Sequence, residues 1–401
     1  MVKQLSNRFV NCLYFLRQWA FGLAVLMNLH SHAQTFSPAA QVSLLTCSSG
    51  SELYTSFGHS AFRVRDTISG VDVVYNYGIF NFDAPNFYTN FIRGKLRYML
   101  GREGMRGFLR QYVAEDRTVV EQQLLLSPQQ NQRIINFLEN NYLPENRYYW
   151  YDFFYDNCST KLRDILEKQL TDSLRLNSPT THTKTFRQLL GEKVGNDTWI
   201  KLGFDIILGI TTDQIAGFRH EMFLPSYLSA GVENGIEVKT ANGWQRIMKK
   251  KTVLYQAQNV PPPISIWQKP FIWIAAICFF YLLLSLFPQG TVLHRFGDHF
   301  LLIICGILGI LLLGMLFTDH RPTHYNLNLL WLNPLLLVFI IMGWFGERWR
   351  QMRWMTALAG ALIVLLMWFL SPQQFNVCFV PVLVLLVVRS ADNLGLFANF
   401  K

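Results

Sequence analysis

The pattern of apolar and polar positions divides this chain into two parts. Up to about residue 250, short apolar stretches alternate with polar ones, as in a domain of mixed strands and helices. From residue 271 onward, apolar segments succeed one another, each long enough or nearly so to cross roughly 30 Å of hydrocarbon as a helix. These segments are residues 271–287, 299–317, 327–345, 355–370 and 374–388. The pattern predicts an α+β domain followed by an α-helical transmembrane bundle of about five helices, with four to six as the range because the last two segments are short.

Local signals place several elements within the first part. Residues 60–66 (SAFRVRD) alternate apolar and charged side chains, and residues 71–82 (VDVVYNYGIFNF) have the composition of a returning strand, so we expect a hairpin that turns at 67–70. Residues 128–142 have a helical period, with Ser127 as the N-cap and a proline at the first helical position. A further helix is expected to begin near residue 158.

The first 33 residues resemble a signal peptide or an N-terminal anchor. Basic residues precede a short apolar run (WAFGLAVLMNL, 19–29) that ends near the small residue Ala33. Export of the chain from residue 34 predicts this organisation: 34–250, a periplasmic domain; 251–270, a Pro-rich linker; 271–390, the transmembrane domain; 391–401, a cytoplasmic tail. The positive-inside rule agrees, because loop 346–354 carries three arginines and the loops on the outer side carry only Arg321. We therefore expect a multi-pass protein of the inner (cytoplasmic) membrane with its large domain in the periplasm.

The net charge of +10 is dispersed along the chain. In a membrane protein, such a charge favours a lipid headgroup surface over nucleic acid as the partner. The exported part contains no cysteine pairs with metal-ligand spacing and no Gly-rich phosphate loop, so we expect no cofactor and no metal.

Two of the six cysteines, Cys47 and Cys158, lie in the exported part. They allow two interpretations: a Cys47–Cys158 disulfide, which is a structural feature, or a free thiol at Cys158. Cys158 comes directly after Asn157, a good N-cap, and would therefore lie in the first turn of a helix. The helix dipole and free N–H groups at that end favour a thiolate, the form that attacks a carbonyl carbon.

A thiol nucleophile needs a base and a group that orients the base. His59 opens the strand 60–66 directly after a glycine, whereas His182 lies in a Thr-rich loop and His220 on a predicted helix, so His59 is the better candidate. If the hairpin turns near 67–70, Asn76 passes beside His59 and becomes the expected orienting residue. The alternatives that stay open for this role are Tyr75, Asp72, Asn81 and Asp83.

Other polar residues are candidates for substrate binding, and Tyr75 is one of them. Asn157, Ser159 and the backbone N–H groups at the start of the helix are candidates for stabilising an oxyanion. The loop between the second and third apolar segments carries His320, His324 and Asn326 on the same side of the membrane as the exported domain, where polar groups can hold a phospholipid headgroup.

Several blocks of the sequence together resemble a known family. They are LLTCSSGSELYTSFGHSAFRV, VVYNYGIFNF, FIRGKLRYML, YYWYDFFYDNCSTKLRD and EMFLPSYL, over about residues 38–235. These blocks resemble the Lnb N-terminal periplasmic domain, whose named member is a lipoprotein N-acyltransferase. The order of histidine before cysteine also resembles the circularly permuted NlpC/P60 and LRAT-like thiol enzymes. The resemblance implies a papain-like α+β fold in which Cys158 is the nucleophile and His59 the base.

These observations lead to one main hypothesis and two rivals. The main one is a cysteine-dependent acyltransferase that moves an acyl chain from a membrane phospholipid, through a Cys158 thioester, to the α-amine of a diacylglyceryl-cysteine on a lipoprotein. Its partners would be the phospholipid, the diacylated lipoprotein and the bilayer, without nucleic acid. The first rival is a membrane-tethered NlpC/P60-like hydrolase of peptidoglycan or peptides, and the second is a non-enzymatic membrane assembly protein with a Cys47–Cys158 disulfide.

Overall fold

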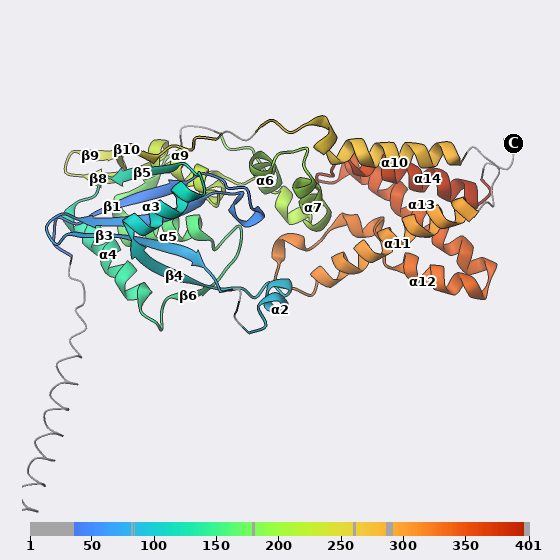
Figure 1. Cartoon of the computed structure of the whole chain (residues 1–401), viewed down its shortest axis with the longest axis horizontal. Helices are drawn as coiled ribbons and strands as arrows, with labels where there is room; N and C mark the ends of the chain where they lie inside the picture. Colours follow the sequence, from blue (N-terminus) through green and yellow to red (C-terminus); the bar gives the residue numbers. More distant parts are fainter. Residues whose placement is uncertain are drawn as a thin grey trace, which may run out of the picture.

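The computed structural model describes residues 36–396 except 82, 84, 179–180, 260–261 and 286–291. The expected leader, residues 1–33, and the end of the expected tail lie outside the described residues. The elongated molecule has a mixed domain at one end and a helical bundle at the other, as Figure 1 shows. This arrangement confirms the predicted fold class of an α+β domain followed by a helical membrane domain.

An antiparallel sheet of seven strands forms the centre of the first domain. Its order is β10-β5-β1-β2-β3-β4-β6. The hairpin between β2 and β3 turns at residues 67–70 as predicted, with Phe62 opposite Tyr75. The strands are β1 (Gln41–Cys47), β2 (His59–Asp66), β3 (Val71–Ile79), β4 (Arg97–Gly104), β5 (Val119–Leu124), β6 (Tyr148–Trp150) and β10 (Met248–Tyr255). Because β10 pairs with β5 up to Tyr255, the sheet includes residues that the sequence analysis assigned to the linker from 251 onward.

Helices cover both faces of this sheet. On one face α4 (Pro128–Tyr142), α5 (Cys158–Leu170) and α9 (Pro225–Asn234) bury a core of aliphatic and aromatic side chains that includes Phe62 and Leu162. On the other face α3 (Met105–Ala114) packs Phe108 against Leu45 and Val74. The predicted Ser127 cap of α4 is present as a full capping box with Gln130, which satisfies N–H groups at the helix start.

Shorter elements complete the domain. A second sheet joins β7 (Leu174–Leu176), β8 (Ile236–Thr240) and β9 (Gly243–Arg246). The remaining α-helices of this domain are α2 (Phe87–Ile92), α6 (Phe186–Val194), α7 (Trp199–Ile207) and α8 (Phe218–Glu221). The 3-10 helices in the described part of the chain are η1 (Leu53–Thr55), η2 (Thr171–Ser173), η3 (Ile210–Asp213), η4 (Ile266–Gln268), η5 (Arg321–Thr323), η6 (Leu327–Leu330) and η7 (Gly343–Phe345).

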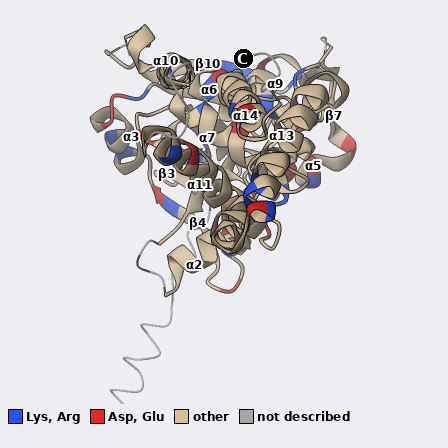
Figure 2. Cartoon of the chain, turned by 90° about the vertical axis from the view of Figure 1, so that its right-hand side faces the viewer, with Lys and Arg blue, Asp and Glu red and all other residues tan. Residues whose placement is uncertain are grey.

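The bundle consists of α10 (Pro270–Leu284), α11 (Val292–Met315), α12 (Leu335–Met342), α13 (Glu347–Leu370) and α14 (Phe379–Asn393). In the described part of the chain, three helical segments are long and apolar enough to cross a membrane: Val292–Met315, Leu327–Phe345 and Glu347–Leu370. α10 is apolar but shorter. Figure 2, viewed onto the bundle end of the molecule, shows these helices with few charged residues along their length. This composition suits helices surrounded by lipid.

The exported domain is attached to the bundle through α7. The side-chain amide of Asn328 donates to the carbonyl oxygen of Asp205 at 2.8 Å, and that of Asn376 donates to an Asp205 carboxylate oxygen at 2.7 Å. Arg187 on α6 holds the same carboxylate at 2.9 Å and is itself only 2 % exposed. These buried polar contacts are costly to leave unpaired, so they hold α7 against the outer end of the bundle.

Candidate active site

Cys158 is the first residue of α5, as the sequence predicts. Asn157 caps the helix: its side-chain oxygen accepts from the N–H groups of Ser159 at 2.8 Å and Thr160 at 3.0 Å. The Asn157 amide group also donates to the carbonyl oxygens of Phe153 at 2.7 Å and Phe223 at 2.9 Å. The helix start is thereby fixed, and the partly exposed Cys158 side chain lies at its positive end.

Two glycines bring the thiol and the imidazole of His59 together. Gly58, at a φ of 81°, approaches β1 so closely that a Cβ there would lie 2.7 Å from the Cys47 carbonyl oxygen. Gly78, at a φ of 98°, lies beneath both functional side chains: a Cβ there would lie 3.8 Å from His59 Cε1 and 3.9 Å from Cys158 Cβ. Glycine adopts positive φ values more easily than other residues, so glycine suits both positions. His59 and Cys158 therefore converge over the same point of β3.

The second nitrogen of the imidazole meets Asn76. His59 Nε2 lies 2.6 Å from Asn76 Oδ1, and since an amide oxygen only accepts, Nε2 carries the proton. The other nitrogen, Nδ1, is then free to face Cys158, whose charge raises the pKa of His59. Glu103 on β4 is the next polar group: burial raises its pKa, and an interaction with Asn76 lowers it in part. The structure thus joins Cys158, His59, Asn76 and Glu103 in one chain, of which the sequence analysis named the first three.

Charges in this chain stabilise one another. Burial alone raises the pKa of Cys158, but the His59 charge, the hydrogen bonds from His59 and Ser159 and the backbone N–H of Ser60 outweigh burial, so that pKa lies below its ordinary value. Burial alone lowers the pKa of His59, yet the thiolate charge and the hydrogen bonds with Cys158 and Asn76 raise it above its ordinary value. The two shifts together favour a thiolate–imidazolium pair.

The α5 N-terminus also supplies an N–H group for an oxyanion. The Ser159 and Thr160 N–H groups are used by Asn157, and that of Lys161 donates to the Asn157 carbonyl oxygen at 3.0 Å. Among the described residues the Cys158 N–H has no such partner. A donor next to the nucleophile sulfur is well placed for the charge that develops on an attacked carbonyl oxygen.

Four residues expected near the substrate are instead buried, and their side chains support the fold. They are Tyr75, Asn157, Ser159 and Asn326, none of which is more than 5 % exposed. The Tyr75 hydroxyl bonds Glu139, and that of Ser159 bonds Ser60 at 3.0 Å. The Asn326 amide donates to the Ile206 carbonyl oxygen at 2.7 Å. Their polar groups are thus bonded within the fold, as is usual for buried polar groups, and contact of these four side chains with a substrate stays a prediction.

The two histidines of the outer loop lie at the junction of the domain and the bundle. His320 Nε2 donates to the Phe91 carbonyl oxygen at 2.8 Å, and His324 Nε2 to that of Thr318 at 3.0 Å. Both side chains remain partly exposed. Of the alternatives for orienting His59, Asp72 is held by Arg63 at 2.7 Å, and Asn81 Oδ1 accepts from the N–H of Asp83 at 2.9 Å.

Cys47 is a free thiol, as is Cys158, so this structure contains no disulfide between them. Cys47 is buried opposite His59 in the β1–β2 pair. Burial raises its pKa to about 12, which keeps this thiol protonated. The contrast between two cysteines of one domain comes from their surroundings, an apolar core for Cys47 and a helix terminus beside an imidazole for Cys158.

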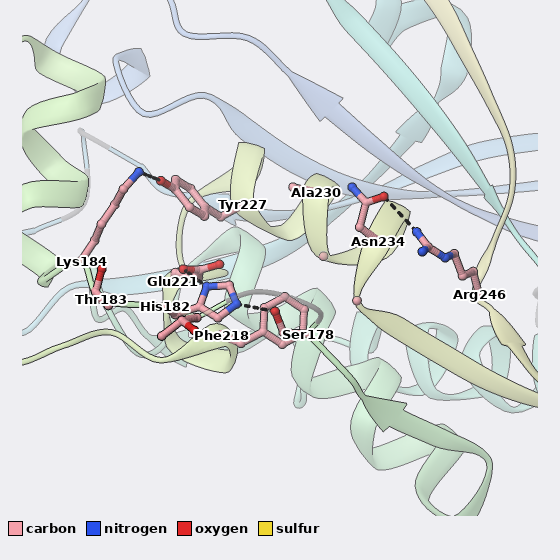
Figure 3. A pocket seen from close by; sticks show the side chains of 13 residues that line it. Ser178, His182, Thr183, Lys184, Phe218, Glu221, Tyr227, Ala230, Asn234 and Arg246 are labelled. Carbon is pink, nitrogen blue, oxygen red and sulfur yellow. Dashed lines mark hydrogen bonds and ion pairs between the residues drawn. The ribbon is translucent and has the colours of Figure 1, made fainter.

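A second cluster of polar groups lies away from Cys158. His182 Nδ1 lies 2.8 Å from a Glu221 carboxylate oxygen, and its Nε2 meets the Ser178 hydroxyl. With Lys184 and Arg246 these residues line a cavity of about 440 Å³, shown in Figure 3. His182 is therefore not a partner of the thiol. In the described part of the chain, no three His, Cys, Asp or Glu side chains are grouped so as to hold a metal ion.

The fold and the Cys158–His59 site define a class of protein. It has an exported α+β domain, with a cysteine–histidine pair at a helix terminus, joined to a transmembrane bundle. Two family models match the chain, the Lnb N-terminal periplasmic domain over residues 30–192 and the Lnb transmembrane domain over residues 263–399. The chain belongs to the Lnb family. Membership of this family indicates a membrane enzyme concerned with the N-acylation of lipoproteins.

The first match ends at residue 192, before the limit of about 235 suggested by the sequence blocks, and it includes all four members of the Cys158 chain. The comparison with curated proteins found no match, and neither did the comparison with solved structures.

Proposed function

We propose that this protein is a lipoprotein N-acyltransferase that uses Cys158 as its nucleophile. The observation that carries the proposal is the position of Cys158 at the positive end of α5, where it converges with His59, whose Nε2 bonds Asn76. A thiolate held in this way attacks acyl carbonyl groups. Family membership supplies the acceptor class, a lipoprotein.

The first half of the reaction loads the enzyme. The Cys158 thiolate attacks an ester carbonyl of a phospholipid, and the oxyanion that forms accepts a hydrogen bond from the Cys158 N–H. When the intermediate collapses, the bond to the glycerol oxygen breaks, and His59 Nδ1 gives its proton to that oxygen. The products are a lysophospholipid and a thioester on Cys158, with His59 neutral. Asn76 holds the imidazole so that Nδ1 faces the reacting atoms both when it carries the proton and after it has given the proton away.

The second half transfers the chain. The α-amine of a diacylglyceryl-cysteine attacks the thioester carbonyl, and His59 Nδ1 takes a proton from that amine. Collapse of the second intermediate breaks the carbon–sulfur bond, which forms the amide and returns the thiolate–imidazolium pair. Both substrates are confined to a bilayer, so a domain held on a transmembrane bundle gains effective concentration that a free domain would lack.

We place the protein in the inner membrane with the exported domain in the periplasm. The basic loop 346–354 lies at the bundle end away from the exported domain, which agrees with the positive-inside rule. The proposed organisation remains a leader in residues 1–33, a periplasmic domain that now extends through β10, a linker, the bundle and a short cytoplasmic tail.

The test uses the full chain in vesicles with a phospholipid labelled in its acyl chains. Wild-type protein should acquire label that neutral hydroxylamine removes, and a diacylated lipopeptide should discharge it. Cys158→Ala should acquire none, while Cys47→Ala, a matched loss of the other exported thiol, should still load. Cells whose only copy carries Cys158→Ala should show lipoprotein N-terminal peptides lacking the third acyl chain.

Three outcomes would contradict the proposal in different ways. Unchanged N-acylation with Cys158→Ala would show that another group is the catalyst. Discharge of the label to water alone, with no gain from the lipopeptide, would favour a hydrolase. Resistance of Cys158 in the unreduced, denatured wild-type protein to thiol reagents would favour the non-enzymatic alternative with a disulfide.

A further inference from the structure

Aromatic rings form a continuous row between the outer loop of the bundle and the active site. Phe80 stacks on Tyr98 with ring centroids 4.9 Å apart, and Tyr98 stacks on Tyr151 at 4.3 Å. In the other direction Phe80 meets Phe87 at 6.1 Å, and Phe87 meets Phe91 at 6.4 Å. We call these five residues the aromatic row.

One end of the row lies near the start of α5, the helix that begins at Cys158. Burial and the Cys158 charge together raise the pKa of Tyr98 to about 12, and burial and that same charge also raise the pKa of Tyr151. Tyr98 also pairs with Tyr149, the residue whose ring lies 4.3 Å from the Lys161 ammonium on the first turn of α5. This end of the row is thus next to the start of α5.

The other end of the row lies on α2, which touches the outer loop. The Phe91 ring is 6.3 Å from that of His320, and the Asp319 N–H donates to the Arg93 carbonyl oxygen at 2.9 Å. A Cβ at Gly94 would lie 2.9 Å from the backbone nitrogen of His320, so the segment that follows α2 is in close contact with the outer loop. Because α11 ends at Met315, only a few residues before this loop, α2 lies beside the end of the bundle that faces the first domain (Figure 1).

α2 carries apolar side chains that the protein leaves uncovered. Tyr88 is 72 % exposed, Ile92 64 % and Phe91 50 %. Basic residues lie beside them: Arg93 is exposed, and Lys95 lies 3.8 Å from Asp319. Apolar side chains beside cations match the boundary between acyl chains and phosphate headgroups. Because α2 contacts the outer loop of the bundle, we favour this lipid boundary over a protein partner as the surface that α2 meets.

We propose that α2 inserts into the outer leaflet of the membrane and that the aromatic row guides a phospholipid acyl chain from there to Cys158. Ile92 and Tyr88 enter the acyl region, Arg93 and Lys95 meet the phosphate, and the rings of Phe87 and Phe80 cover the chain as its ester approaches the thiol. This inference rests on the proposed function, since it names the route by which the acyl donor reaches the same site.

The test compares two donors on the full chain reconstituted in vesicles of phosphatidylethanolamine and phosphatidylglycerol. One donor is a labelled long-chain phospholipid within the bilayer, and the other is a short-chain phospholipid dissolved in water. Ile92→Glu and Tyr88→Glu should reduce loading of Cys158 from the bilayer donor about tenfold or more, because a carboxylate resists entry into the acyl region. Loading from the dissolved donor should stay within about twofold of wild type.

Ile68→Glu is the matched control. Ile68 is 73 % exposed but lies in the β2–β3 turn, at the opposite end of β2 from His59, so neither donor should be affected. Equal bilayer loading by Ile92→Glu and wild type would overturn the inference, and so would an equal loss with both donors. Failure of the wild type to load from either donor would instead contradict the proposed function.

A second variant tests the row itself. Phe87→Ala should slow loading of Cys158 from long-chain phospholipids more than from short-chain ones. The substitution removes apolar surface that only a long acyl chain reaches. An equal effect on all chain lengths would show that the row does not guide the chain.

Discussion

Replacing Asn76 tests the chain of hydrogen bonds most directly. Asn76→Ala removes the acceptor that lies 2.6 Å from His59 Nε2 and that stabilises the charged imidazolium. A hydrogen bond to a charged group contributes about 1.5–3 kcal/mol. Asn76 is partly exposed, so water replaces part of the lost bond, and the lower value of about 1.5 kcal/mol applies. That energy corresponds to a fall of about one unit in the pKa of His59.

The consequence for the thiol comes from the ion pair. The pKa of Cys158 is lowered and that of His59 is raised, so thiolate and imidazolium coexist between these two values. A lower pKa of His59 removes the imidazolium at a lower pH, so the upper limit of this range moves down. The loading rate at neutral pH, which needs both ions, should therefore fall, by at most about tenfold for a shift of one unit.

The assay measures alkylation of Cys158 by iodoacetamide across pH, together with the loading rate from labelled phospholipid. Quantifying the Cys158 peptide by mass keeps the other cysteines out of the measurement. Asn136→Ala is the control, since Asn136 is an exposed asparagine on α4 whose side-chain oxygen accepts from Gln132 at 2.7 Å. An Asn76→Ala protein whose alkylation profile and loading rate both equal those of the wild type would refute the role of Asn76.

Three further predictions concern residues around this site. Glu103→Leu removes the partner that positions Asn76, so it should shift the alkylation profile in the same direction but by less, a few-fold in loading rate, and no shift would contradict that role. Gly78→Ala forces a side chain into a φ of 98°, at a cost of about 1–2 kcal/mol, and should lower both the melting temperature and the loading rate; an unchanged rate would show that the turn does not position the site. Arg187→Met leaves the buried Asp213 carboxylate without its cation, while Asp205 keeps Lys201, and should cost about 3–5 kcal/mol, lowering the melting temperature in detergent by roughly 6–20 °C. Arg175→Met, which breaks the exposed pair with Glu237, should cost about 0–1 kcal/mol, and similar losses for the two arginine variants would contradict the reasoning.

Local features of this protein were accessible from its sequence. The turn at residues 67–70, the Ser127 cap and the start of α5 after Asn157 all appear where the pattern predicts them. The division into a mixed domain and an apolar bundle came from hydropathy alone. These features depend on a few neighbouring residues, because caps, turns and apolar periodicity satisfy backbone groups within a short stretch of chain.

Contacts between distant parts of the chain needed the tertiary structure. The hairpin turn brings β3 back beside β2, so Asn76 was a reasonable expectation, but Glu103 joins the chain only through the pairing of β3 with β4, in which it lies opposite Val74. No local signal marks that register, and a shift by one residue would turn the carboxylate to the other face of the sheet.

The burial of polar side chains also depended on the tertiary structure. Asn157, Ser159 and Asn326 are polar residues in promising positions, and the sequence assigns them to the substrate with good reason. The folded chain instead supplies each with a partner from another segment: Phe223 for Asn157, Ser60 for Ser159 and Ile206 for Asn326. The sequence determines which groups can form hydrogen bonds, but only packing decides whether the partner is another part of the protein or a substrate.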